Sequence, residues 1–362
     1  MDLATVWFIL IAVLWSGYFV LEGFDFGVGM LMPVVAKNEG ERRAVLTTLG
    51  PLWDGNEVWL IVAGGATFAA FPEWYATMFS GFYIPLLLIL LALIVRGVAF
   101  EYRSKLSNLK VRRRYDVMIW IGSFLPALLW GVAFANIVRG IPLKAAPYGN
   151  ILYDGGFFNL LNPYALIGGL TTLFLFLTHG AVFLTLKTSG SIHDRAKKIA
   201  TPLGIIAAVL AVVFLVWTQV AYSDKAATWI MVVAGALLWV GAIIAHKIGR
   251  DGWAFILSAA TLVGAVAFLF WVLFPNVFPA SNDPSLSLTI YNASSTEYTL
   301  QVMTIVALIF TPVVLIYQAW TYWIFRKRIS ADVIPSPDEG SLDYPEERPS
   351  VQVGRDRSTP GC

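Results

Sequence analysis

The chain has 362 residues, of which 58% are apolar, 14% aromatic and only 13% charged. A soluble domain usually carries about 25% charged residues, so this chain has about half the charge needed to cover a water-facing surface. The composition therefore excludes a set of soluble domains, which the length alone would suggest, and indicates an integral membrane protein with many spans. The net charge of +2 adds little, because the position of each charge matters more here than the sum.

Nine segments are long and apolar enough to be membrane-spanning helices, since a span needs about 20 mostly apolar residues. Two of them begin at prolines, Pro51 and Pro163, which are suited to a first helical turn. The predicted fold class is an all-α integral membrane protein with two four-helix bundles plus one peripheral helix. In chain order, the predicted spans are Leu3–Val35, Pro51–Phe71, Trp74–Phe100, Val117–Val138, Pro163–Leu186, Ile199–Ala221, Ala226–Ala245, Trp253–Phe274 and Leu300–Phe325.

The loops alternate between rich and poor in lysine and arginine, in step with these spans. Of the 25 basic residues, 21 lie in the loops after the odd-numbered spans, including the C-terminal segment. Only Arg139, Lys144 and Lys225 lie on the other side, and Arg96 lies inside the third span. Because cytoplasmic loops carry the excess of Lys and Arg, the pattern predicts an N-terminus outside and a cytoplasmic C-terminus.

Residues 1–328 are predicted to form a single polytopic transmembrane domain, and 329–362 a disordered cytoplasmic tail rich in Pro, Glu, Asp and Ser. The N-terminus lacks the basic region of a cleavable signal peptide, so the first apolar stretch is expected to be a retained span. The loop Pro275–Thr299 is expected to fold against the outer face. The single cysteine, Cys362, excludes disulfide frameworks and thiolate metal sites.

Ionisable groups inside the predicted spans are the most informative residues, because a charge at the bilayer centre costs about 2.5–3.5 kcal/mol even on the mildest scale. Glu22 and Asp25, in the stretch LEGFDFGVGM, are three residues apart and share a helix face. They are candidates for a proton relay that faces the bundle interior, and a structural ion pair or a packing motif is the alternative. Gly23 and Gly27 in the same stretch let a neighbouring helix approach closely.

The second span opens with PLWDGNEVWL, in which Asp54 and Glu57 are again three residues apart. Acids in the first turns of a helix also complement its positive end, so a role in the helix terminus alone stays open. Their position favours the functional interpretation, because both would lie at the same membrane face as Asp25.

The third span contains Arg96, which lies nine residues before Lys105 and so about 14 Å inside the basic boundary. A buried guanidinium needs a carboxylate partner, and Glu22, Asp25 and Asp54 are at compatible depth. Glu101 lies at the mouth of this charged layer. The layer is predicted to conduct or tune proton uptake from the cytoplasm.

Histidine is scarce, with only His179, His193 and His246 in the chain. Only His179 lies within a predicted span, and a packed, hydrogen-bonded imidazole is favoured there over a haem ligand. We therefore predict no metal site and assign no catalytic residue to this chain, and the residues that bind a cofactor are left unassigned. No nucleotide-binding pattern is found, and no nucleic-acid partner is expected.

A set of longer segments carries a resemblance to a known family. They are GFDFGVGML at Gly23–Leu31, GERRAVLTTLGPLWDGNEVWLIVAGGATFAAFP at Gly40–Pro72, FSGFYIPLLL, RGVAFEYRSK, IGSFLPALLWGVAFAN, FFNLLNPYALIGG, WAFILSAATL, LTIYNASSTEYTL and the last span. In this order they cover most of residues 5–328, and the chain closely resembles subunit II of the cytochrome bd quinol oxidases. One departure is the very short loop Tyr222–Ala226, where other members carry a longer outer segment.

The resemblance implies a multi-pass subunit in the bacterial cytoplasmic membrane, in a complex that oxidises quinol, reduces O2 to water and contributes to the proton motive force. It implies that haem b and haem d lie mainly on the partner, cytochrome bd subunit I, which also carries the quinol-binding loop. It allows a small accessory subunit, and it implies contact with membrane lipids and quinone. Asp25, Asp54 and Arg96 match family positions associated with proton delivery and subunit integrity.

Two other classes of function stay open from the sequence. The chain could be purely a structural scaffold for its partner, with the charged layer locking the assembly. It could also be a proton-coupled membrane transporter, which nine spans and buried acids would fit. The transporter hypothesis is weaker, because matching halves with Gly- or Pro-broken helices are not found.

Overall fold

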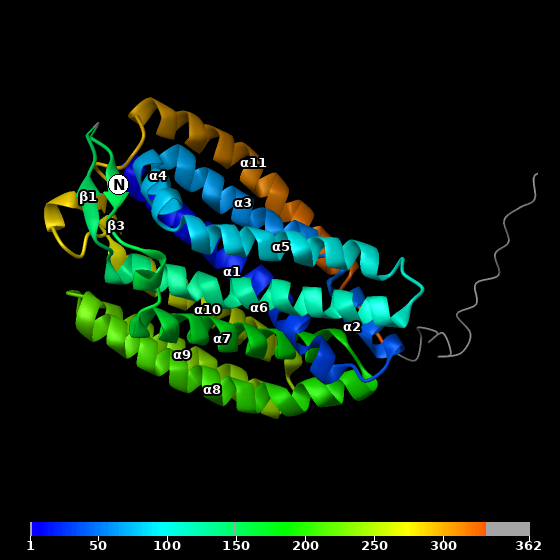
Figure 1. Cartoon of the computed structure of the whole chain (residues 1–362). Helices are drawn as coiled ribbons and strands as arrows, with labels where there is room; N and C mark the ends of the chain where they lie inside the picture. Colours follow the sequence, from blue (N-terminus) through cyan, green and yellow to red (C-terminus); the bar gives the residue numbers. More distant parts are fainter. Residues whose placement is uncertain (1, 148, 331–362) are drawn as a thin grey trace, which may run out of the picture.

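The computed structural model describes residues 2–147 and 149–330, in which long helices lie side by side along one axis (Figure 1). The helices are α1 Leu3–Val35, α2 Glu39–Leu49, α3 Trp53–Ala70, α4 Pro72–Gly81, α5 Tyr83–Arg103, α6 Leu109–Arg139, α7 Pro163–Lys187, α8 Gly190–Tyr222, α9 Thr228–Lys247, α10 Asp251–Leu273 and α11 Glu297–Ile324. Two short antiparallel strand pairs join β1 Leu143–Ala145 to β2 Ile151–Tyr153 and β3 Asn276–Phe278 to β4 Leu288–Thr289. Two 3-10 turns lie at Phe157–Leu160 and Pro284–Leu286.

Eight of the described helices are long and apolar enough to cross a membrane, namely α1 and α5 to α11. This confirms a mostly helical, multi-pass membrane architecture. The remaining predicted span, Pro51–Phe71, corresponds to α3, which has 18 residues and includes Asp54 and Glu57. Helix α3 packs along α1 and contacts α5 through the Glu57–Arg96 ion pair, and a total of nine spans stays a prediction.

Helices α6 and α8 begin eight and nine residues before their predicted spans, and two other parts of the chain differ in their elements. The segment Trp74–Phe100 was predicted as one helix and this is wrong, because α4 ends at Gly81 and α5 begins at Tyr83. The cause is Pro85, whose ring has no N–H to donate and would clash with the carbonyl of Gly81 in a continuous helix. The loop after the first span contains a further helix, α2, which Asn38 caps by accepting a hydrogen bond from the Glu41 N–H at 2.8 Å.

Helix α1 lies at the centre of the bundle and packs against α3, α6, α7 and α10. Its close approach to α7 depends on glycine, because a Cβ atom at Gly27 would lie 2.0 Å from the Phe176 carbonyl oxygen and 2.8 Å from the Gly180 Cα. The small-residue pair predicted at Gly23 and Gly27 is therefore confirmed as a helix contact. Helix α11 is the opposite case, since Leu300 is its only buried residue.

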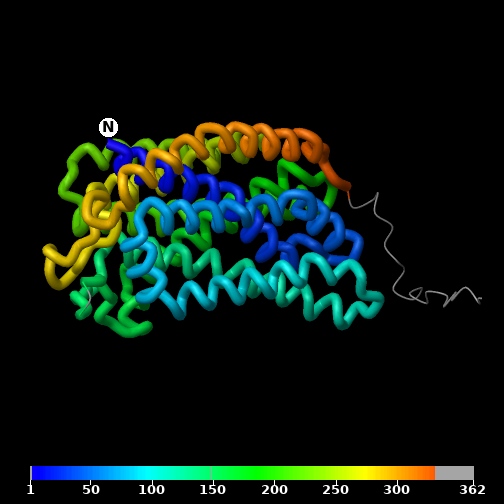
Figure 2. Tube along the Cα trace, turned by 90° about the horizontal axis from the view of Figure 1, so that it is seen from above, coloured from blue at the N-terminus to red at the C-terminus, as the bar shows by residue number. Residues whose placement is uncertain are grey.

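The strand pairs lie together at the end of the bundle that also holds the N-terminus (Figure 1). The segment 275–299 folds back onto this end: Asn282 bonds to the backbone of Leu143, and the Ser295 N–H donates to the Ala70 carbonyl at 2.8 Å. That this end is the outer face stays a prediction. Helix α2 and the end of α11 lie at the opposite end (Figure 2). There the Ile329 N–H donates to the Lys187 carbonyl at 2.8 Å. The predicted tail from 331 onward lies outside the described residues.

Candidate functional site

A buried ionic cluster joins three helices in the interior of the bundle. The Nη1 atom of Arg96, on α5, donates to Glu22 Oε2 on α1 at 2.9 Å and to Glu57 Oε1 on α3 at 2.8 Å. The side chains of Arg96 and Glu22 are fully buried, and that of Glu57 is 22% exposed. The predicted need of Arg96 for a carboxylate partner is thus met by two acids at once.

The surroundings of Arg96 favour a cation. Its guanidinium carbon lies 4.8 Å from the centre of the Phe26 ring and 5.0 Å from that of Phe100, in the range of cation–π contacts. Helix α6 approaches at Gly122, where a Cβ atom would lie only 2.6 Å from the Cβ of Arg96. The Nε and Nη2 atoms are buried and have no hydrogen-bond partner among the described residues.

Asp25 lies next to this cluster and is held by a different partner. Its Oδ2 atom accepts a hydrogen bond from Asn56 Nδ2 at 2.7 Å, and Asn56 Oδ1 accepts one from the hydroxyl of Tyr322 at 2.7 Å. Both Asp25 and Asn56 are fully buried. The second oxygen of Asp25 is also buried, without a hydrogen-bond partner in the described chain. Asp25 therefore forms no direct ion pair with Arg96, and it is linked to α3 and α11 through an amide.

The two other predicted residues lie outside this site. Asp54, in the first turn of α3, and Glu101, near the end of α5, are both exposed. Within residues 2–147 and 149–330 neither side chain forms a hydrogen bond or an ion pair. The structure thus groups Glu22, Glu57 and Arg96 directly, adds Asp25 through Asn56, and leaves Asp54 and Glu101 at the edge.

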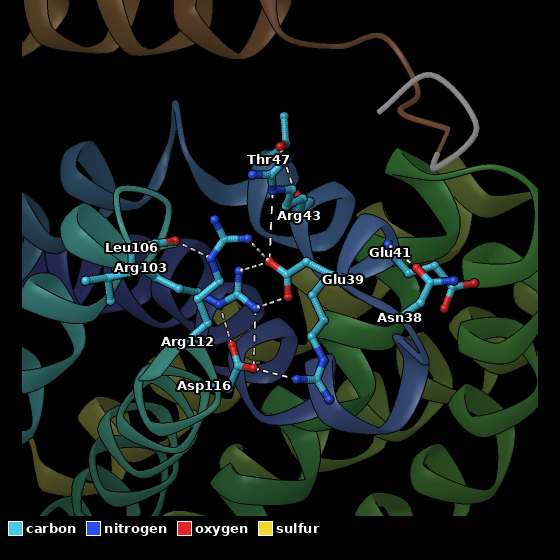
Figure 3. Close-up of polar contacts among 10 residues, drawn as sticks. Asn38, Glu39, Glu41, Arg43, Thr47, Arg103, Leu106, Arg112 and Asp116 are labelled. Atoms are coloured by element: carbon cyan, nitrogen blue, oxygen red, sulfur yellow. Dashed lines mark hydrogen bonds and ion pairs between the residues drawn. The ribbon is translucent and has the colours of Figure 1, made fainter. Parts of the chain in front are cut away.

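A second ionic network lies at the end of the bundle where α2, α5 and α6 meet (Figure 3). Arg103 donates to both oxygens of Glu39, each at 3.0 Å, and its Nε donates to Asp116 Oδ1 at 2.5 Å. Arg112 donates to Glu39 at 3.0 Å, and Arg42 to Asp116 at 2.7 Å. Burial by itself would raise the pKa of Glu39, but the hydrogen bonds and charges of Arg103 and Arg112 outweigh it and lower that pKa.

Glu41 forms a third contact set, between α2 and α8. Its carboxylate accepts hydrogen bonds from the Lys37 N–H and Ser191 Oγ, each at 2.6 Å, and pairs with Arg195. Arg195 in turn donates to the Val35 carbonyl at 2.6 Å. Burial favours a higher pKa for Glu41, but these hydrogen bonds outweigh it and lower the pKa to about 2. The ends of α1, α2 and α8 are therefore fastened by an ionised carboxylate.

Several residues that form hydrogen bonds or ion pairs in these clusters were missed in the sequence analysis. Asn56 lies in the same WDGNE motif as Asp54 and Glu57, but a neutral amide carries no charge signal. Tyr322 lies 266 residues away from Asn56, so that only the packing of α11 reveals the contact. Glu39 and Asp116 flank basic stretches and look like ordinary solvated charges in the sequence.

His179 tests whether the chain could ligate a haem within a span. Its Nδ1 lies 2.8 Å from Ser258 Oγ, its Nε2 lies 3.2 Å from the Val20 carbonyl, and its ring stacks on Phe255 at 4.7 Å. An axial ligand needs a ring nitrogen with a free lone pair and space for the macrocycle. His179 offers neither, so it does not fit a haem, and the favoured packed imidazole is confirmed. Groups of three or more His, Cys, Asp or Glu side chains that could hold a metal are absent from the described residues.

The fold and the site together define a multi-pass helical membrane protein that keeps several ionisable groups, paired and unpaired, within its bundle. The chain belongs to the family of cytochrome bd terminal oxidase subunit II, whose model matches residues 3–325. This confirms the resemblance drawn from the sequence segments. It also identifies the chain as a subunit of an oxidoreductase of the respiratory chain and as a multi-pass protein of the bacterial cell membrane.

Similar proteins support the assignment over nearly the whole length. The cytochrome bd ubiquinol oxidase subunit 2 of Bacillus subtilis is 42% identical over 333 residues, which cover 91% of this chain and 97% of that protein. The cytochrome bd-I ubiquinol oxidase subunit 2 of Escherichia coli is 36% identical over 362 residues, covering 91% and 96%. A chain of the bd oxidase from Geobacillus thermodenitrificans has the same fold, with a TM-score of 0.70 at 19% identity, covering 90% of this chain and 100% of that one.

Proposed function

We propose that this chain is the second subunit of a quinol-oxidising, oxygen-reducing complex and that it helps to deliver protons from the cytoplasm. We assign haem b, haem d and the quinol site mainly to the partner, subunit I, as the family resemblance implies, and the packed His179 supports this assignment for the haems. A small accessory subunit and bound lipid or quinone stay expectations from the resemblance. The chain's own part is to supply the groups that hold and pass protons.

The observation that carries this proposal is the excess of buried acids over buried bases. Glu22, Glu57 and Asp25 face a single cation, Arg96, and only two of the three acids bond to it. Three ionised carboxylates beside one guanidinium would leave net negative charge in a medium of low dielectric, at a cost of several kcal/mol per uncompensated ion. A cluster of this composition holds a proton among its members and can exchange it, which is what a relay requires.

The exposed acids complete the route at its entrance. Asp54 lies one helical turn before Glu57 on α3, and Glu101 lies beyond Arg96 on α5. Both side chains are exposed in the described chain. We assign Asp54 and Glu101 to proton entry, and Glu57, Glu22 and Asp25 to transfer inside the bundle. Arg96 compensates the negative charge that remains on the acids.

The proposal also assigns each end of the helix bundle to one side of the membrane. In this proposal α1, α3, α5 and α6 form one four-helix bundle and α7 to α10 the other, with α11 peripheral; α5 packs on α6, α7 on α8 and α9 on α10. The end that holds α2 carries the arginine-rich networks, so it is assigned to the cytoplasm and the N-terminal end to the outside. Protons released from quinol outside and taken up inside would separate charge across the membrane without a pumping step.

The test is the variant Asp25→Asn in the assembled complex, with Asp25→Glu as the conservative partner. We expect Asp25→Asn to slow oxygen reduction and proton uptake by about a hundredfold, since a positioned acid–base group contributes at least this much. Asp25→Glu should restore most of the rate. Full turnover and full proton uptake in Asp25→Asn, with haem content intact, would show that the relay role is wrong.

The two alternative functions, a structural scaffold and a proton-coupled transporter, predict different results for the purified complex. A purely structural scaffold predicts that Asp25→Asn loses the haem bands and the partner subunit together. A proton-coupled transporter predicts that the chain purifies without a haem-bearing partner. An optical spectrum of the complex isolated through this chain separates the three.

A further inference from the structure

A hydrogen-bonded chain of three residues leads from the buried acids to the edge of the bundle. Tyr322 on α11 donates to Asn56 Oδ1 at 2.7 Å, and Asn56 Nδ2 donates to Asp25 Oδ2 at 2.7 Å. Asn56 is fully buried, whereas Tyr322 is half-buried and lines a mostly apolar groove of about 510 Å3 together with Trp59. Helix α11, otherwise nearly unburied, thus has a polar side chain that reaches towards the proton site.

Asn56 is the only residue in the described chain that hydrogen bonds to the Asp25 carboxyl group. The other charged or titratable groups near Asp25 are Glu22 on the same helix, Glu57 on α3 and Arg96 on α5, and they act on it through space. The orientation of one amide therefore decides whether Asp25 meets a donor or an acceptor.

The observed orientation suits an ionised Asp25. A carboxylate only accepts hydrogen bonds, so Asn56 must turn its NH2 group towards it. The amide oxygen then faces α11, where it needs a donor, because an unpaired buried acceptor is costly. The Tyr322 hydroxyl is that donor, and it therefore fixes the orientation of the amide.

The opposite orientation suits a protonated Asp25. A carboxylic acid donates one hydrogen bond, and Asn56 can accept it once its amide rotates by half a turn, which exchanges the positions of oxygen and nitrogen. The NH2 group then faces Tyr322, whose hydroxyl oxygen can accept. An amide and a phenol each offer both roles, so Asp25 stays bonded to Asn56, and Asn56 to Tyr322, in either state. A leucine at 56 or a phenylalanine at 322 could not.

We propose that Asn56 and Tyr322 are positioning residues that form a reversible hydrogen-bond switch around Asp25. The switch keeps Asp25 hydrogen-bonded before and after it takes a proton. Through Tyr322, a residue of α11 thereby influences the hydrogen bonding of Asp25. This inference rests on the proposed role of Asp25 in proton delivery.

The experiment compares Tyr322→Phe with Tyr317→Phe in the assembled oxidase complex. Tyr317 lies five residues earlier on the same helix, is 64% exposed, and its hydroxyl has no hydrogen bond in the described chain, so it controls for the loss of a phenol. Proton uptake after mixing with oxygen is measured together with haem content. We expect Tyr322→Phe to slow uptake by about tenfold, from the loss of one buried hydrogen bond, and Tyr317→Phe to leave it unchanged.

A spectroscopic readout separates positioning from simple loss of packing. The infrared C=O stretching band of protonated Asp25 is identified as the band that disappears in Asp25→Asn. Because this band shifts with the hydrogen bonds of the carboxyl group, we expect it to move in Tyr322→Phe and in Asn56→Leu but not in Tyr317→Phe. Rates and band positions in Tyr322→Phe equal to those in Tyr317→Phe would overturn the switch. If Asp25→Asn itself had full activity, the proposed function would fail first.

Discussion

The buried cluster around Arg96 and the network around Arg103 use the same residue types in opposite proportions. Around Arg96, acids outnumber the single base, and several oxygen and nitrogen atoms lack a partner in the described residues. Around Arg103, three further arginines (Arg42, Arg43 and Arg112) pair with the carboxylates of Glu39 and Asp116, so that each carboxylate has at least two cationic partners. An excess of acids inside the bundle allows one of them to carry a proton, whereas an excess of arginines at the end of the bundle holds the carboxylates in one geometry.

The largest effect should come from removing the one cation of the buried cluster. We expect Arg96→Leu to leave Glu22 and Glu57 without compensation and to destabilise the assembled protein by at least about 3–5 kcal/mol. The measurement is the yield of haem-containing complex and its thermal midpoint. An assembled complex of normal stability would contradict the account, because it would mean that Arg96 does not hold the charge of these acids.

A smaller effect is expected in the second network. Asp116→Asn removes the charge that binds Arg103 and Arg42, which should lower the free energy of unfolding by about 1.5–3 kcal/mol. Proton uptake per haem should stay unchanged, because this carboxylate lies outside the buried cluster and is held by two arginines at the end of the bundle. The control is Asp154→Asn, whose exposed pair with Lys144 should contribute no more than about 1 kcal/mol. Slower proton uptake in Asp116→Asn at full haem content would show that the end network also takes part in proton uptake, which would contradict its purely structural role.

The smallest effect is a pH dependence of stability at the α2 end. The folded-state pKa of Glu41 is lowered from 4.5 to about 2, so its ionised form stabilises the fold above about pH 4.5. This contribution is lost as the pH falls from about 4.5 towards 2, and the lowered pKa of Glu39 acts in the same direction. The thermal midpoint of the wild type should therefore drop more steeply between pH 5 and 3 than that of Glu41→Gln. Parallel curves would show that Glu41 does not carry the effect.

Much of the architecture could be predicted from the sequence, because apolar length and the position of charges are local properties. The first predicted span, Leu3–Val35, coincides with α1, and the need for a small residue at Gly27 was visible in the motif. The depth of Arg96 pointed to Glu22, Asp25 and Asp54 alike. Of these only Glu22 bonds to it, and Glu57, its second partner, was not among them. By contrast, the break between α4 and α5 was missed, because Pro85 lies within a long apolar segment that by itself favours one continuous helix.

The finer site could not be predicted, because it depends on which helices become neighbours. Asp54 and Glu57 look equivalent in the sequence, yet only Glu57 pairs with Arg96, because Asp54 lies one turn nearer the start of α3, where its side chain is exposed. The Tyr322–Asn56 contact joins distant parts of the chain, and no local pattern marks either residue. The partner choice of Glu39 and Asp116 depends in the same way on how α2 packs against α5 and α6.

The central claim is that the buried acids move protons while the end network only holds the fold. The most direct measurement is time-resolved proton uptake by the assembled complex carrying Asp25→Asn, compared with Asp116→Asn at matched haem content. The account predicts uptake slowed by about a hundredfold in Asp25→Asn and unchanged in Asp116→Asn. Equal uptake rates in the two variants would contradict it.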